Sequence, residues 1–252
     1  MRRSRVIPCL TILDGDLVKT VGFKAPRYVG DPINAVRLFN EMEVDELVVL
    51  DIGASRFGKA PDRALIADLA SEAFMPIAYG GGVRSADEAA SLSAIGVEKI
   101  VVDSVALADP TLVTAMAARL GSSSTVASIT VERDWHGRPR VYDPACRRRS
   151  AIDPAHYARR LAELGAGEIL INDVDRDGRY AGYDAALVAA IAEAVNVPVI
   201  ACGGAGSVGD LSAGIAAGAS AVAAGSMFMF YSPRRGVLIN YPPEAELAAR
   251  IP

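Results

Sequence analysis

The feature that most limits how this chain can fold is an internal repeat. Shifting the sequence by 122 residues, the distance from Asp31 to Asp153, superimposes identical residue types without a gap. The matching positions are Asp31-Pro32 with Asp153-Pro154, Glu46 with Glu168, Asp51 with Asp173, Pro76 with Pro198, Gly81-Gly82 with Gly203-Gly204, Ser85 with Ser207, Gly96 with Gly218 and Ser104 with Ser226. One offset that aligns so many turn and charge positions predicts two similar halves, about residues 1–122 and 123–252.

Short apolar, β-branched runs alternate along the chain with amphipathic stretches rich in Ala and Leu. The runs predict strands over 5–13, 46–52, 75–79, 98–103, 125–131, 168–173, 197–202 and 220–225, and the stretches predict helices near 33–43, 62–73, 86–96, 110–119, 154–164, 185–195 and 208–217. Strands that are apolar on both faces belong to a parallel sheet covered by helices. The sequence therefore predicts an α/β fold, a (β/α)8 TIM barrel built from two repeated half-barrels.

The C-terminal end departs from the repeat. After Ser226 the prolines and the glycine leave room for only a short helix near 244–250, so an abbreviated, irregular end is expected. No Pro/Ser-rich linker or step in composition divides the chain, which predicts a single domain over 1–252.

Composition and charge limit the classes of partner. The 252 residues carry 26 Lys and Arg against 30 Asp and Glu, a formal net charge of −4, which argues against binding nucleic acid or an anionic membrane. No apolar run has the length of a membrane span or of a signal peptide. Three cysteines and two histidines show no metal-ligand spacing. We expect a reduced, cytoplasmic protein without a bound metal.

Four of the predicted strands end in small residues. Gly81-Gly82 and Gly203-Gly204 follow the third and seventh strands, and Asp103-Ser104 and Gly225-Ser226 follow the fourth and eighth. Loops at these strand ends carry the chemistry of such barrels, and glycine N–H groups, serine hydroxyls and helix N-termini bind anions. The repeat predicts two phosphate sites on opposite sides of the barrel mouth, spanned by a ligand with a phosphate at each end. The alternative is that the glycines only permit tight turns.

Several motifs resemble those of the cyclase subunit of imidazole glycerol phosphate synthase, a barrel of histidine biosynthesis. They are RVIPCL at 5–10, GDP at 30–32, DELVVLDI at 45–52, GGGVRS at 80–85, GAGEILIN at 165–172, DRDG at 175–178, GYD at 182–184 and IACGGAG at 200–206. The resemblance extends to about Phe228. It implies a bisphosphate ligand, ammonia delivered through the barrel by a glutaminase docked on the N-terminal face, and no metal or organic cofactor.

The chemistry of that family depends on two aspartates, which end the first and fifth barrel strands and serve as general acid and base. Thr11 and Thr130 occupy these positions here. A threonine hydroxyl does not exchange protons near pH 7, and each lost acid–base group typically costs ~10²–10⁴-fold in rate. Asp51, Asp103 and Asp175 lie near strand ends and are interpreted as structural or ligand-orienting groups.

Other segments are similar to the glycosyl-amidation-associated paralogues of the family, which accompany bacterial surface polysaccharide synthesis. They are CL at 9–10 followed by Thr11, LVKTVGFKAPRYVGDPINA at 17–35, FMPIAYGGG at 74–82 and VLINYP at 237–242. This likeness implies that the barrel, with a glutaminase, supplies ammonia to a separate ATP-dependent sugar amidotransferase. Thr11 fits the paralogues, whereas Thr130 departs from them because an aspartate is often kept there.

The family also closes its ammonia passage with four charged residues at the N-terminal end of the barrel, and the counterparts here are Arg5, Glu46, Lys99 and Glu168. Such paired, partly buried ions are costly to break singly, although the same ion pairs could close the barrel for stability alone. Lys19, in the long first loop, is expected to reach a ligand phosphate or to fold with this loop as a lid.

The sequence thus predicts the synthase-side barrel of a glutamine amidotransferase that conducts ammonia for sugar amidation. One alternative is an authentic imidazole glycerol phosphate synthase cyclase, a lyase of histidine biosynthesis. Another is a phosphosugar isomerase of the related histidine-pathway barrel.

Overall fold

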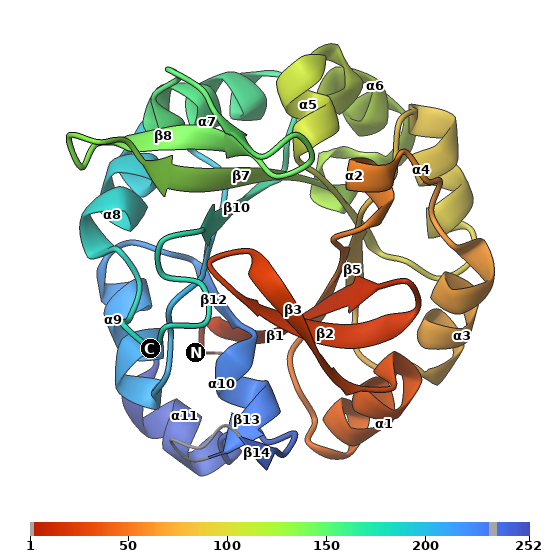
Figure 1. The fold of residues 1–252 in the computed structure, drawn as a ribbon, viewed down its shortest axis with the longest axis vertical. Coiled ribbons are helices and arrows are strands. Elements are labelled where there is room, and N and C mark those ends of the chain that lie inside the picture. Colours follow the sequence, from red (N-terminus) through yellow and green to blue (C-terminus); the bar gives the residue numbers. More distant parts are fainter. Residues whose placement is uncertain (1–2, 232–235) are drawn as a thin grey trace.

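The structure is a computed structural model that describes residues 3–231 and 236–252. Within these residues eight parallel strands close into a barrel that is ringed by helices (Figure 1). The barrel strands are β1 (Arg5–Leu13), β4 (Leu47–Asp51), β5 (Ile77–Gly80), β6 (Lys99–Val102), β7 (Thr125–Arg133), β10 (Glu168–Asp173), β11 (Val199–Cys202) and β12 (Ala221–Ala224). Because β1 pairs with both β4 and β12, and β7 pairs with β10, the sheet closes on itself. The predicted TIM barrel is confirmed.

The outer layer of helices begins where the repeat places its capping residues. Its helices are α1 (Pro32–Glu41), α3 (Arg63–Glu72), α4 (Ala86–Ser93), α6 (Thr111–Leu120), α7 (Pro154–Glu163), α8 (Ala185–Ala194), α9 (Val208–Ala216) and α11 (Glu244–Arg250). Asp31 and Asp153 cap α1 and α7, each followed by a proline at the first helical position. Ser85 and Ser207 cap α4 and α9 in the same way. The repeated residues therefore set matching helix starts in the two halves. Among the described residues, no helix has the length and apolar character that a membrane crossing requires.

Alternate side chains of the barrel strands belong to two separate apolar clusters. One fills the space between strands and helices, with Phe39, Tyr79 and Phe228 among its largest buried members. The other fills the lumen and consists of Ile7, Cys9, Val48, Ala78, Val101, Val126, Leu170, Ile200, Cys202, Ala221 and Ala223. Both faces of each strand are buried, which is why the strand sequences do not alternate between apolar and polar residues.

The loops at the carboxyl ends of the strands contain elements that the sequence pattern did not predict. β2 (Asp16–Val21) and β3 (Lys24–Gly30) form an antiparallel hairpin that lies across the barrel mouth (Figure 1). β8 (Pro139–Asp143) pairs with the extended end of β7 and with β9 (Arg148–Arg149). Short helices follow three strands, namely α2 (Ala54–Phe57), α5 (Ser104–Ala108) and α10 (Ser226–Met229). The first loop, in which Lys19 was expected, is thus a hairpin with Lys19 in β2.

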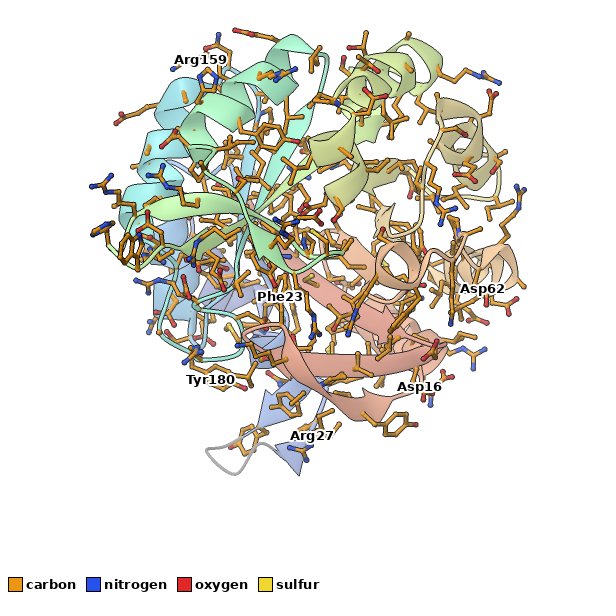
Figure 2. All side chains as sticks on the ribbon, turned by 45° about the horizontal axis from the view of Figure 1, so that its top comes forward. Asp16, Phe23, Arg27, Asp62, Arg159 and Tyr180 are labelled. Atoms are coloured by element: carbon orange, nitrogen blue, oxygen red, sulfur yellow. The ribbon has the colours of Figure 1, made fainter. Side chains whose placement is uncertain are left out.

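Contacts from the opposite side of the barrel hold the hairpin over the mouth. The Thr20 hydroxyl donates to the Asp177 carboxylate at 2.8 Å, and the Gly22 N–H donates to the Asp177 carbonyl at 3.1 Å. Phe23 lies at the tip of the hairpin (Figure 2), and its N–H donates to the same carboxylate at 3.3 Å. Because Asp177 follows β10, these bonds join the first and sixth sectors of the barrel.

The C-terminal end is short, as the sequence pattern predicts. After α10 the chain forms β13 (Phe230–Tyr231) and β14 (Gly236–Val237), and the intervening residues 232–235 lie outside the described part of the chain. The tail returns to the start of β1, where the Tyr241 hydroxyl donates to the Val6 carbonyl at 2.9 Å. Arg3 forms ion pairs with Asp45 and Glu244, both at 2.5 Å. These contacts attach the tail to the N-terminal end of the barrel.

Candidate functional site

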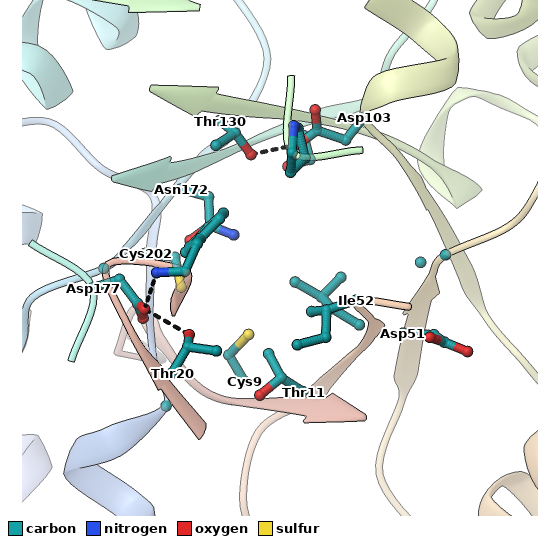
Figure 3. A pocket seen from close by; sticks show the side chains of 18 of the residues that line it. Cys9, Thr11, Thr20, Asp51, Ile52, Asp103, Thr130, Asn172, Asp177 and Cys202 are labelled. Carbon is teal, nitrogen blue, oxygen red and sulfur yellow. Dashed lines mark hydrogen bonds between the residues drawn. The ribbon is translucent and has the colours of Figure 1, made fainter. Parts of the chain in front are cut away.

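A cavity opens at the carboxyl ends of the barrel strands, beneath the β2–β3 hairpin (Figure 3). The space between its walls is about 1470 Å³, including the part open to solvent. Its lining includes most of the mouth residues singled out from the sequence, namely Thr11, Lys19, Gly81, Asp103, Ser104, Thr130, Gly203, Gly204, Gly225 and Ser226. Gly82 is buried and is not among the lining residues, and its N–H donates to the Ser55 hydroxyl at 3.1 Å.

The strand ends rich in small residues form two pairs on opposite sides of this cavity. The ends of β5 and β6 make one pair, and the ends of β11 and β12 make the other. In the closed order of strands, β5 lies opposite β11 and β6 lies opposite β12. Gly81 and Gly203 have φ angles of +126° and +98°, and a Cβ atom at either would lie within 2.8 Å of a neighbouring carbonyl oxygen. Turn geometry alone therefore accounts for these two glycines. Anion binding at the two pairs stays a prediction.

Lys19 brings a buried positive charge to one of these pairs. Its side chain is only 7% exposed, and its ammonium donates to the Cys9 carbonyl at 2.5 Å. A Cβ atom at Gly225 would overlap this ammonium, so the cation lies against the end of β12. A buried ammonium beside the Gly225-Ser226 turn is a suitable partner for an anionic group.

Thr11 and Thr130, which the sequence resemblance places at the acid–base positions, are hydrogen-bonded within the cavity wall. The Thr11 hydroxyl donates to the Val18 carbonyl of the hairpin. The Thr130 hydroxyl donates to the Asp103 carboxylate at 2.7 Å, and the Ser128 hydroxyl donates to the same oxygen at 2.7 Å. A carboxylate is therefore present beside Thr130, but it comes from the end of β6 and not from β7.

Asp103 differs from the other aspartates near strand ends. Burial raises the pKa of Asp103 to about 7, although the hydrogen bonds from Ser128 and Thr130 oppose this rise. By contrast, the Asp51 carboxylate accepts hydrogen bonds from two N–H groups at the start of α2, both at 2.9 Å. The Asp175 carboxylate accepts from the Arg133 N–H at 2.7 Å. The sequence interpretation gave all three a structural or ligand-orienting role and named Asp51 and Asp175 first as substitute proton carriers, whereas burial singles out Asp103 in the structure.

Other groups of the cavity were given no functional role from the sequence. Asn172 and Asp177 line it, from the end of β10 and from the loop that follows. Cys9 and Cys202 also line it, and a hydrogen bond between the two thiols lowers the pKa of Cys9 and raises that of Cys202. The DRDG motif at 175–178 was the available signal for Asp177. In the described part of the chain no group of three or more His, Cys, Asp and Glu residues is arranged to hold a metal ion.

The opposite end of the barrel is closed by the predicted ring of four charged side chains. Arg5 contacts Glu46 and, at 2.5 Å, Glu168. Lys99 contacts the same two carboxylates at 3.0 and 2.8 Å. Burial disfavours the charged form of Arg5, but the two carboxylates outweigh this effect and raise the pKa of the guanidinium. Each cation therefore bridges both anions across the N-terminal end of the lumen.

The fold and the site together define a class of protein, a (β/α)8 barrel with a cavity at the carboxyl ends of its strands and a ring of ion pairs at the other end. Residues 5–233 match the family described as histidine biosynthesis protein. The chain belongs to this family.

Similar proteins carry more specific names. The chain is 50% identical over 243 residues to a Pseudomonas aeruginosa protein provisionally named imidazole glycerol phosphate synthase subunit hisF2, a match that covers 96% of this chain and 97% of the relative. It is 41% identical over 234 residues to imidazole glycerol phosphate synthase subunit HisF of Hyphomonas neptunium, covering 91% of each chain. Identity to the subunit of the same name from Streptomyces coelicolor is 40% over 232 residues, covering 92% of each. The resemblance to the cyclase-subunit family is confirmed.

The paired strand ends generate a prediction about anion binding. In crystals grown with abundant sulfate, we expect one sulfate at Gly81 and Ser104 and a second at Gly203, Gly204 and Ser226, because these strand ends line the cavity with N–H groups and a hydroxyl. A diffraction structure measures the occupancy of both sites. Two turns that hold only water would contradict the prediction and leave the requirement for tight turns as the reason for the glycines.

Proposed function

We propose that this chain is the barrel subunit of a glutamine amidotransferase system. It receives ammonia from a glutaminase docked at the N-terminal end of the barrel and conducts it through the lumen to the mouth, for amidation of a sugar in surface polysaccharide (O-antigen-type) biosynthesis. The partner proposed at the mouth is an ATP-dependent sugar amidotransferase. The observation that carries the proposal is an apolar lumen with a ring of paired charges at one end and the cavity at the other.

The ring supports the proposal of a gate because each of its two cations forms ion pairs with both of its carboxylates. Removing Lys99 leaves both carboxylates paired with Arg5, so the ring is weakened without leaving a buried charge unpaired. Lys99 is suited to move, since its ammonium sits on a flexible stem, whereas the guanidinium of Arg5 is a rigid fork. Lys99 is also partly exposed, at 17% of its side chain, so a docked partner can reach it.

The lumen above the ring suits a small neutral molecule. Its walls are aliphatic side chains and two thiols, which give a medium of low dielectric constant. An ion entering such a medium loses its hydration at a high cost, whereas neutral ammonia does not carry that penalty. The lumen therefore favours ammonia over ammonium.

The assignment to sugar amidation depends on sequence likeness. Residues 17–35 and 237–242 resemble the glycosyl-amidation-associated paralogues, and the Pseudomonas aeruginosa relative carries a numbered subunit name, hisF2. Threonine at both positions 11 and 130 separates this chain from a barrel that relies on two carboxylates there.

One observation favours a second candidate, an authentic cyclase subunit of imidazole glycerol phosphate synthase. The Asp103 carboxylate lies 2.7 Å from the Thr130 hydroxyl and titrates near neutral pH. A single acid–base group could therefore remain in the cavity, and direct measurement of turnover separates the two candidates.

The gate generates a prediction about coupling. With its glutaminase, the wild-type barrel is expected to deliver nearly one ammonia for each glutamine hydrolysed. Lys99→Ala is expected to leave the barrel folded but to open the ring. Glutamine hydrolysis then continues, but it is uncoupled from ammonia use because ammonia is no longer confined at the floor, and the ammonia delivered at the mouth falls. The control is Lys59→Ala, which removes a lysine that forms an exposed ion pair with Asp14. Parallel assays of glutamate and of transferred ammonia measure the ratio, and an unchanged ratio in Lys99→Ala would remove the gate.

The two threonines generate a prediction about catalysis. With ammonium salts, the isolated wild-type barrel is expected to convert the bisphosphorylated ribotide of imidazole glycerol phosphate synthesis at least ~10²-fold more slowly than a relative with both aspartates. Binding of the ribotide is retained, because the backbone N–H groups are unchanged. The double variant Thr11→Asp/Thr130→Asp is expected to recover part of the rate. Wild-type turnover equal to that of such a relative would instead establish the authentic cyclase.

A further inference from the structure

Asp103 occupies the last inward-facing position of its strand. Side chains on β6 alternate, so Lys99 lies at the floor, Val101 in the lumen and Asp103 at the mouth. Two hydroxyls of the neighbouring strand, Ser128 and Thr130, are two residues apart and therefore point to the same side. Both donate to Oδ2 of Asp103, which fixes the carboxyl group in one orientation.

This arrangement leaves one carboxyl oxygen for the cavity. The two bonds from β7 end on Oδ2, neither uses Oδ1, and Asp103 lines the cavity wall. The charged and titratable groups around it are Asp143 on β8, which adds to the rise of its pKa, and Tyr157 on α7, whose own pKa is raised by burial and by Asp103. A carboxyl group that titrates near neutral pH is well matched to proton exchange.

We propose that Asp103 is the catalytic group that accepts and returns a proton when ammonia adds to a ligand at the mouth. The inference rests on the proposed delivery of ammonia, but it places the addition of ammonia on a ligand held in the barrel's own cavity and not in a separate amidotransferase. It defines the ligand as a phosphorylated compound with an electrophilic carbon that bears a displaceable oxygen, such as a carbonyl or an activated amide. Ser128 and Thr130 are positioning residues, because they act only through the orientation of Asp103.

The proton and electron balance of the step is simple. The lone pair of ammonia forms a bond to the carbonyl carbon while the π pair of the C=O bond moves onto the oxygen, so the adduct carries a positive nitrogen and a negative oxygen. An N–H bond of the adduct breaks, its electron pair stays on the nitrogen, and its proton moves to Oδ1 of Asp103. Asp103 then returns the proton to the oxygen, the nitrogen lone pair forms a second bond to the carbon, and the C–O bond breaks so that the oxygen leaves with its electron pair as hydroxide, which takes a proton from the iminium nitrogen and departs as water. The carboxylate is regenerated, and no oxidant or reductant is needed.

The position of Thr11 provides the test of this role. Thr11 lies across the cavity from the Asp103–Thr130 pair (Figure 3). A carboxylate introduced there by Thr11→Asp would face Asp103 over the ligand and create a pair of acid–base groups. If Asp103 transfers protons, this single substitution suffices for activity although position 130 remains a threonine.

The experiment measures ammonia-dependent turnover of the bisphosphorylated ribotide, with rates expressed per free ammonia between pH 6 and 9. We expect Thr11→Asp to exceed the wild-type rate by at least ~10²-fold. Adding Asp103→Asn to Thr11→Asp is expected to return the rate to the wild-type level. Adding Thr130→Asp to that double variant is expected to restore the rate of Thr11→Asp, because the carboxylate is then supplied by the neighbouring strand β7. The matched control adds Asp109→Asn to Thr11→Asp. Asp109 lies on the exposed turn before α6, so this variant is expected to keep the rate of Thr11→Asp. Circular dichroism verifies folding, and Thr11→Glu replaces any Thr11→Asp protein that does not fold.

The pH profile distinguishes proton transfer from a structural role. Asp103 acts as a base only when ionised, so kcat/KM of Thr11→Asp per free ammonia is expected to rise with pH through about 7 and then to level off. Thr130→Val in the same background is expected to move this rise in kcat/KM to higher pH, because it removes a hydrogen bond that favours the carboxylate form of Asp103. Failure of Thr11→Asp to bind or to convert the ribotide, or retention of its rate after Asp103→Asn, would overturn the proposal. High wild-type turnover that is lost in Asp103→Asn would support it while removing the proposed function.

Discussion

Closure of the parallel sheet is the constraint on which the rest of this structure depends. In a closed barrel every second side chain of a strand points into the lumen, and its height is set by its position along the strand. On β1, Arg5, Ile7, Cys9 and Thr11 therefore lie in order from the floor to the mouth. The same alternation on β6 places a charge at each end and a valine between them. A lumen with ion pairs at one end, apolar side chains in its middle and a polar cavity at the other end follows from strand alternation alone.

The barrel could be predicted from the sequence because its determinants are local. Apolar runs that do not alternate marked all eight strands, and the repeat placed the caps of α1, α4, α7 and α9. The β2–β3 hairpin could not be predicted, because bonds to Asp177, more than 150 residues along the chain, fix it over the mouth. The β8–β9 extension likewise carries arginines and prolines that do not form a strand pattern.

The candidate site was predicted in outline, and its chemistry was not. Glycine and serine positions identified the mouth because turns impose their residue types locally. The importance of Asp103 depends on burial and on two hydroxyls of a different strand, neither of which its own neighbours in sequence reveal. Thr130 lies on β7 and Asp103 directly follows the adjacent strand β6, so the cavity has an acidic group beside the Thr130 hydroxyl. The four charged residues of the floor could be named from the sequence because each begins or directly precedes a strand, and the structure pairs them, whereas their role as a gate stays a prediction.

The central claim is that this barrel works with a glutaminase docked at its charged floor. It is tested most directly by mixing the purified barrel with a candidate glutaminase and measuring both co-elution and the rate of glutamine hydrolysis. The account predicts a stable complex in which glutamine hydrolysis rises on mixing, and in which the ammonia produced is recovered at the mouth. Absence of a complex, with hydrolysis unchanged by the barrel for every glutaminase of the source genome, would contradict the account.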